Sequence, residues 1–127
     1  MIPVPGRRDR DHGSATVEIA VALPALVLVT VAALWGVTAA AAQVRCVDAV
    51  RAGARAAARG EPLPAVRAVV AGAAPAGARV GVSRGPETTR VEVAVALRPP
   101  VLSGLPALGL RARAVASTEP GVPPSGA

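Results

Sequence analysis

The chain has 127 residues, a formal net charge of +6 and fourteen basic residues, all of them arginine. Its length corresponds to one small domain. One histidine, one cysteine and one tryptophan, without phenylalanine or tyrosine, exclude an internal disulfide, a zinc finger and an aromatic platform for single-stranded nucleic acid. We attribute the arginine content to the coding bias of a GC-rich genome, and we expect no nucleic-acid partner.

The side chains that catalysis needs are scarce. The lone His12 and the lone Cys46 have no companions for a nucleophilic triad or a metal site, and no phosphate-binding glycine loop occurs. We therefore predict that the protein is not an enzyme and has no catalytic residue, cofactor or metal ion. Cys46 is interpreted as a small apolar packing residue, with an intermolecular disulfide as the alternative.

Residues 1–13, MIPVPGRRDRDHG, form a short polar leader with two prolines and no hydrophobic period. This composition predicts disorder. Residues 14–59 are predicted to form one long helix, because an apolar run is followed by an amphipathic stretch.

The first part of this helix is predicted to cross a membrane. From Ile19 to Val44 the sequence contains no charged residue, and about 20 apolar residues suffice to span a bilayer as a helix. Pro24 lies inside this run and Trp35 lies in its second half. A membrane helix tolerates an internal proline better than a soluble helix does.

The helix is predicted to continue beyond the membrane with two opposed faces. Arginines that recur every four residues form a stripe that is typical of a solvated face: Arg51, Arg55 and Arg59. Apolar residues form the opposing stripe: Val44, Val47, Val50 and Ala54. Gly60 and the prolines after it predict the end of the helix.

Residues 60–119 are predicted to form a small α+β domain. A helix over residues 63–74 precedes three segments that alternate with the period of a strand, at residues 78–83, 90–97 and 110–117. The fold class is therefore α+β: a long N-terminal transmembrane helix continues into a domain with a short helix and a three-stranded antiparallel sheet. Residues 120–127 are predicted to be a disordered tail.

A single acidic residue, Glu18, immediately precedes the apolar run. A carboxylate at the centre of a span costs about 2.5–3.5 kcal/mol, and less near the ends. Glu18 therefore either lies among solvated head groups or has a cationic partner. No arginine occurs between Glu18 and Arg45, so a partner inside the membrane has to come from another chain.

Two stretches resemble a known family. GSATVEIAVALPALV, residues 13–27, resembles the N-terminus of type IV prepilins, most closely the TadE-like pseudopilins, or minor pilins, of tight-adherence pilus systems. VEVAVALRPPVLSGLPALGLRARAVASTE, residues 91–119, resembles the paired strands and the proline-leucine loop that close TadE-like domains. Many members have phenylalanine after the glutamate, where this chain has Ile19.

The resemblance implies how the N-terminus is used. In the family, a prepilin peptidase cuts the leader after a glycine, and the fifth residue of the mature chain is glutamate. For this chain it implies cleavage between Gly13 and Ser14, which makes Glu18 the fifth residue. It also implies that Glu18 neutralises the new α-amino group of a neighbouring subunit during assembly. Membrane lipid, the peptidase and other pilus subunits are the implied partners.

The resemblance implies a single-pass protein of the cell membrane, or of a pilus, with the leader cytoplasmic and the C-terminal domain extracytoplasmic. A count of positive charges does not favour this orientation, because the leader carries three arginines and four more follow the span: Arg45, Arg51, Arg55 and Arg59. We side with the resemblance, because the glycine-serine-glutamate register is hard to obtain by chance.

Two other interpretations stay open. The four alanines at residues 39–42 provide a signal-peptidase motif before Gln43, as expected for a secreted soluble protein. The apolar run is, however, longer than an ordinary signal-peptide core of about 7–15 residues. The arginine stripe could alternatively belong to a membrane-tethered binder of nucleic acid or lipid.

Overall fold

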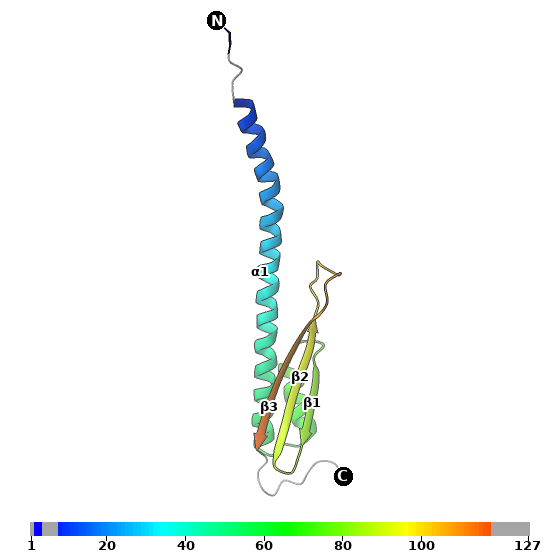
Figure 1. Cartoon of the computed structure of the whole chain (residues 1–127). Helices are drawn as coiled ribbons and strands as arrows, with labels where there is room; N and C mark the ends of the chain where they lie inside the picture. Colours follow the sequence, from blue (N-terminus) through cyan, green and yellow to red (C-terminus); the bar gives the residue numbers. More distant parts are fainter. Residues whose placement is uncertain (1, 4–7, 118–127) are drawn as a thin grey trace. The chain divides into compact units, whose positions relative to one another are not determined.

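The computed structural model describes residues 2–3 and 8–117, with side chains in the first helix from Gly13 onward. Five elements follow one another: α1 (Arg8–Ala58), α2 (Leu63–Ala73), β1 (Arg79–Arg84), β2 (Thr88–Leu97) and β3 (Leu108–Ser117) (Figure 1). The chain divides into two compact units, Met1–Val37 and Thr38–Ala127, called here the N-terminal and C-terminal units. The predicted α+β class is confirmed, and the tail predicted over residues 120–127 lies outside the described residues.

The helix α1 begins earlier than predicted. It starts at Arg8 and not at Ser14, so the disorder predicted for the leader does not extend over residues 8–13. The sequence offers a reason, since proline and glycine occur before Arg8 but neither recurs until Gly13. One internal glycine costs a helix only about 1 kcal/mol, which the apolar run that follows tolerates.

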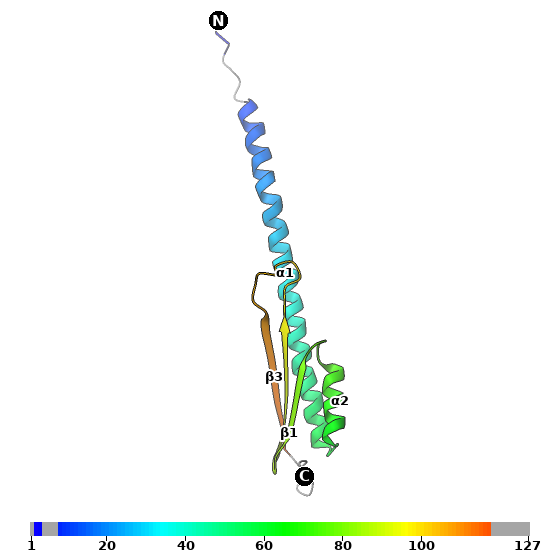
Figure 2. The same ribbon diagram turned by 90° about the vertical axis from the view of Figure 1, so that its right-hand side faces the viewer.

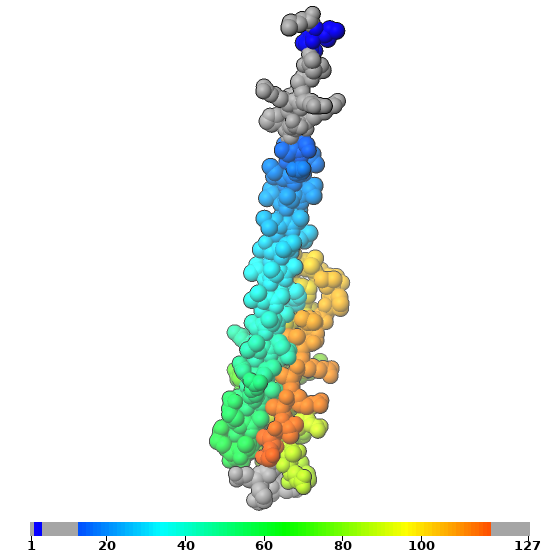
Figure 3. Space-filling model, turned by 60° about the vertical axis from the view of Figure 1, so that its left-hand side comes forward, coloured from blue at the N-terminus to red at the C-terminus, as the bar shows by residue number. Residues whose placement is uncertain are grey.

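In the C-terminal unit, three antiparallel strands lie in the order β1-β2-β3. Both α2 and the second part of α1 cover one face of this sheet, as Figure 2 shows, and β3 runs beside the second part of α1 in Figure 3. The strands β2 and β3 extend beyond the predicted segments, because Thr88 pairs with Ser117 and Leu97 with Leu108. No described helix or strand covers the opposite face of the sheet.

A glycine cap ends α1 where the sequence predicted it. Gly60 adopts a φ of 78°, a conformation that glycine alone adopts without a steric cost. The N–H of Gly60 donates to the carbonyl of Ala57 (3.0 Å), and the N–H of Glu61 donates to that of Ala56 (3.2 Å). This pair of bonds is a Schellman motif, which satisfies carbonyls at the helix end and turns the chain toward α2.

An arginine at the end of β1 holds this turn against the sheet. Arg84 donates from Nη2 to the carbonyl of Glu61 (2.7 Å) and from Nε to Oγ1 of Thr89 (3.3 Å). Thr89 is 1% exposed, and a buried hydroxyl requires a hydrogen-bond partner. Arg84 therefore connects the α1–α2 turn with the β1–β2 hairpin.

The core of the C-terminal unit consists of small and β-branched side chains without an aromatic ring. It combines residues from both helices with the inner face of the sheet: Cys46, Ala49, Val50, Ala56, Ala57, Val66, Val70, Val91, Val93, Val95 and Ala116. Each fully buried valine contributes about 1.5–3 kcal/mol of hydrophobic free energy, so a few valines carry most of the stability.

The face of α1 that packs against the core differs from the predicted stripe. Val50 is buried as predicted, but Val44 is 59% exposed, and the buried stripe instead follows smaller residues: Ala42, Cys46, Ala49, Val50, Ala56 and Ala57. The prediction ranked valine above alanine as an apolar residue. Packing selected the face with the smallest side chains, because that face lets the sheet and α2 approach the helix closely.

Cys46 packs inside this core and has no exposed surface. Burial raises the pKa of its thiol, because desolvation disfavours the thiolate. The sulfur therefore behaves as a small apolar group, as the sequence indicated.

The two helices and the sheet approach one another closely at Gly53. A Cβ at this position would overlap Cγ2 of Val70 in α2 and would lie 3.1 Å from Cγ1 of Val91 in β2. Even one methyl group is therefore excluded. Gly53 allows α1, α2 and β2 to meet at one point.

We predict that Gly53→Ala lowers the stability of the C-terminal unit. Overpacking of a filled core costs about 1–3 kcal/mol, which corresponds to a loss of roughly 4–8 °C in Tm per kcal/mol in a domain of this size. The measurement is thermal unfolding by circular dichroism of the full chain in detergent micelles.

The matched control is Gly72→Ala in α2, where an added Cβ meets nothing within 4 Å. This control is expected to leave Tm unchanged or to raise it slightly, since alanine favours a helix by about 1 kcal/mol over glycine. Equal Tm values for the two variants would show that Gly53 does not set the approach of the three elements.

Candidate functional site

The N-terminal unit presents an apolar helix whose surface is largely exposed among the described residues. Within the described residues, the helical stretch Gly13–Ala58 is the one candidate for a membrane span, and the best part of it has a mean hydropathy of 2.4 and is 0% buried. Most of its large side chains stand 57–68% exposed, among them Leu23 and Val37. An apolar surface of this extent is unfavourable in water and suits lipid, as in a single-pass membrane protein.

Thr30 and Pro24 show how the helix treats polar groups along this surface. The hydroxyl of Thr30 donates to the carbonyl of Leu26 (2.8 Å), so this hydroxyl is satisfied within the helix. Pro24 lies inside α1, and it cannot donate to the carbonyl of Ala20. The helix nevertheless continues through Pro24, as the sequence analysis expected for a segment in lipid.

The other residues predicted for the span occupy different surroundings. Ile19 is 60% exposed near the beginning of the apolar surface, and Val44 is 59% exposed on the part of α1 that belongs to the C-terminal unit. Trp35 is half-buried near the end of the N-terminal unit. Ile19, Pro24 and Trp35 thus share the N-terminal unit, whereas Val44 lies with the C-terminal unit.

The predicted processing junction lies inside the first turns of α1. Gly13 and Ser14 are both helical and exposed, and an added Cβ at Gly13 would meet no atom within 4 Å. A larger residue would therefore fit at position 13 without a steric clash. Packing within the chain gives no reason for this residue, which leaves it open to a role in recognition.

Glu18 follows Ser14 by four residues on the same face of α1, which is about 6 Å along the helix axis. Its side chain is exposed. Among the side chains described from Gly13 to Ser117, the two ion pairs are Arg59–Glu61 and Glu92–Arg113, so Glu18 takes part in neither. A carboxylate at the edge of a lipid-facing surface thus lacks a cation within this part of the chain.

The arginine stripe beyond the span is exposed, as predicted for a solvated face. Arg51 and Arg55 point to solvent, and Arg59 pairs with Glu61, with Nε 3.0 Å from Oε1. This salt bridge uses one member of the stripe to hold the turn after α1. A pair on the surface contributes only about 0–1 kcal/mol, so its effect is local.

Among the residues with described side chains, no group of three or more His, Cys, Asp or Glu residues comes together that could hold a metal ion.

The sequence analysis did not single out two residues that are important for the structure, Gly53 and Arg84. A glycine between alanines in an amphipathic helix is a usable signal of close packing, whereas the partners of Arg84 depend on tertiary contacts.

Comparison with known proteins agrees with this arrangement. The family model described as "TadE-like protein" matches residues 13–55, so the match begins at Gly13 and includes Glu18 and the apolar helix. The chain is also similar to a protein named "Apoptosis inhibitor Rv3655c" from Mycobacterium tuberculosis (strain ATCC 25618 / H37Rv). The two are 44% identical over 104 residues, which cover 82% of this chain and 78% of the relative.

No solved structure matches the chain. The family match covers the N-terminal helix, and the similarity to the mycobacterial protein extends over most of both chains. Together with the resemblance of the residues themselves, these findings establish that the chain belongs to the TadE-like family.

Proposed function

We propose that this protein is a TadE-like minor pilin that one helix anchors in the membrane and that takes part in the assembly of a tight-adherence pilus or a related secretion apparatus. The observation that carries the proposal is the position of Glu18. It stands without an ion pair among the described side chains, one helical turn after Ser14, at the beginning of an exposed apolar helix.

The first step of the proposed function is removal of the leader. A prepilin peptidase cuts between Gly13 and Ser14 and leaves Ser14 with a positively charged α-amino group. The start of the family match at Gly13 supports this step. Residues 1–13 then act as a leader, residues 14–59 as the anchor and its continuation, residues 60–119 as a pilin-like domain and residues 120–127 as a tail.

The second step is neutralisation of Glu18 in lipid. The uncharged stretch after Glu18 contains no cation that could serve as its partner, and the next arginine is Arg45. The new α-amino group of a neighbouring subunit supplies the missing charge. Pairing two charges within the membrane removes the cost of leaving each alone, and this gain drives association of the subunits.

The proposed orientation places the leader in the cytoplasm and the C-terminal unit outside it. The peptidase then meets the leader, while the domain that follows α1 is available to partner subunits. The protein acts by assembly and not by catalysis, which is consistent with a family of structural proteins.

Secretion after cleavage by an ordinary signal peptidase fits the structure less well. The alanine motif at residues 39–42 lies within α1, and Ala42 is 8% exposed in the core of the C-terminal unit. A cut before Gln43 would remove Ala42 from this core and would interrupt the helix that the sheet packs against.

The processing step predicts a mature chain that begins at Ser14. Co-expression with a prepilin peptidase is expected to shorten the protein by residues 1–13, as N-terminal sequencing and intact mass would show. Gly13→Leu is expected to block cleavage, whereas Gly36→Leu in the same helix, where an added Cβ meets nothing within 4 Å, is expected to leave it intact. A mature start at Gln43 would instead identify a secreted protein.

The assembly step predicts that Glu18→Ala still inserts in the membrane but loses its pilus partners. Without Glu18 the neighbour's α-amino group is left unpaired, at a cost below the roughly 2.5–3.5 kcal/mol of a charge at the centre of a span. A cost of about 1.4 kcal/mol would correspond to about a tenfold loss in co-purification of partner subunits, which is the loss we expect. Glu87→Ala, which removes an exposed carboxylate from the β1–β2 turn, is the matched control. Equal co-purification by both variants would contradict the role of Glu18.

A further inference from the structure

The solvent face of the sheet carries its charges in three rows. The register aligns exposed side chains from the three strands in these rows: Arg79, Ala94 and Arg111; then Gly81, Glu92 and Arg113; then Ser83, Arg90 and Val115. Nε of Arg113 lies 2.8 Å from Oε1 of Glu92, so the middle row is neutral. The face therefore presents two positive charges, then none, then one.

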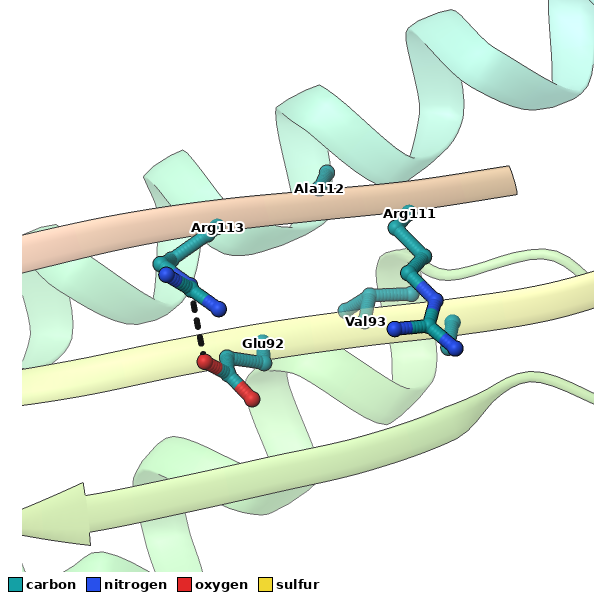
Figure 4. A pocket seen from close by; sticks show the side chains of 6 residues that line it. Glu92, Val93, Arg111, Ala112 and Arg113 are labelled. Atoms are coloured by element: carbon teal, nitrogen blue, oxygen red, sulfur yellow. Dashed lines mark ion pairs between the residues drawn. The ribbon is translucent and has the colours of Figure 1, made fainter. Parts of the chain in front are cut away.

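The first row borders a groove. Two adjoining hollows of about 310 and 300 Å³ lie on this face and share Ala94 and Arg111. Arg79 lines the second hollow, together with Ala96 and Gly109. Figure 4 shows the side chain of Arg111 reaching from β3 over β2, as that of Arg113 does toward Glu92. Ala94, Ala96 and Gly109 are thus among the small residues that line the groove, and its charged lining consists of Arg79, Arg111 and the paired Glu92 and Arg113.

The backbone of Arg111, which borders the groove, is hydrogen-bonded to α1 on the other side of the sheet. Nε2 of Gln43 in α1 donates to the backbone carbonyl of Arg111 (3.2 Å). This bond attaches the edge strand β3 to α1 and holds the backbone of Arg111 in place. The backbone at Arg111 therefore loses little freedom when a ligand binds.

The arginines of the first and third rows are available to an anion. Among the residues with described side chains, Arg79, Arg90 and Arg111 take part in no ion pair. Arg79 and Arg111 face each other across Ala94, two strand spacings or about 10 Å apart at the backbone. At this separation both guanidinium groups can donate to one carboxylate held above Ala94.

The pattern of charges distinguishes between anionic partners. A layer of lipid phosphates would place negative charge over Glu92 as well as over the arginines. An extended peptide that runs along the strands can avoid placing negative charge over Glu92. Its alternate side chains stand about 6.8 Å apart, which is the spacing of the three rows, so a neutral side chain can lie at the middle row. A second copy of the chain is disfavoured, since residues 38–117 contain eleven arginines and four carboxylates, a formal net charge of +7.

We propose that this face binds an extended acidic segment of a partner protein. The segment places an acidic side chain between Arg79 and Arg111, a neutral one over the Glu92–Arg113 pair and a second acidic one at Arg90. The expected sequence pattern is therefore an acid at positions i and i+4 and a neutral residue at i+2. This inference depends neither on leader processing nor on Glu18.

The test uses the full chain in nanodiscs of zwitterionic lipid and two labelled peptides of equal composition. Glu-Ala-Ser-Ala-Glu carries the expected pattern, and Ala-Glu-Glu-Ala-Ser does not. Fluorescence anisotropy is expected to give at least about fivefold tighter binding of the first peptide, because only its two carboxylates fit both positive rows. Equal affinities would overturn the proposal.

Two pairs of substitutions distinguish binding in the groove from nonspecific attraction to the positive charge of the whole protein. Arg79→Gln with Arg111→Gln is expected to weaken binding of the first peptide at least about tenfold. Arg51→Gln with Arg55→Gln removes the same charge from the exposed face of α1 and is expected to change binding less than about twofold, since distant surface charges are screened by salt. Equal losses for both pairs would show nonspecific attraction and would contradict the proposal.

A further variant controls for loss of folding. Ala94→Leu places a larger side chain in the groove without changing any charge, and it is expected to weaken binding at an unchanged Tm. Tight binding by Ala94→Leu would place the peptide elsewhere and overturn the proposal. Binding of anionic lipid vesicles in place of the peptide, or peptide-independent self-association, would also overturn it, in favour of a lipid surface or a second copy.

Discussion

One uninterrupted helix has to meet two different surroundings, and the rest of the structure depends on this constraint. In the N-terminal unit α1 exposes large apolar side chains over its surface, whereas in the C-terminal unit its small side chains lie under a sheet and a second helix. Residue size separates the two roles: leucine and valine dominate the exposed part, and alanine, glycine and cysteine the buried stripe. Large apolar side chains on the surface are favourable in lipid, and small side chains in the buried stripe are required for close packing.

The C-terminal unit compensates for its lack of aromatic rings by close approach. Gly53 admits Val70 and Val91 from two other elements, and the hydrogen bonds of Arg84 fasten the turn after α1 to the hairpin. Because apolar residues, mainly valine and alanine, occupy the inner side of the sheet, its charged residues lie on the outer side, where their rows form the groove. The packing of α1 and the surface offered to partners therefore arise from the same alternation of side chains along the strands.

Periodicity in the sequence was sufficient for the fold class, for α2 and for the existence of three antiparallel strands. It was insufficient at the start of α1, where residues 8–13 are helical, and on the buried face of α1, where Val44 is exposed and Ala42 is buried. Hydrophobicity alone does not reveal which face of a helix a sheet can approach. The groove between Arg79 and Arg111 was beyond prediction because it depends on strand register, which fixes the side chains that stand opposite each other.

The proposed function requires the apolar half of α1 to lie in lipid while its other half lies outside. Leu28→Cys and Arg55→Cys, each placed in a Cys46→Ala chain so that the new cysteine is the only one, test this directly in nanodiscs with a water-soluble maleimide. Both positions are exposed on the chain itself, so lipid alone can shield Leu28→Cys. The account predicts labelling of Leu28→Cys at least about ten times slower than that of Arg55→Cys, with equal rates in denaturant. Equal rates in nanodiscs would contradict it.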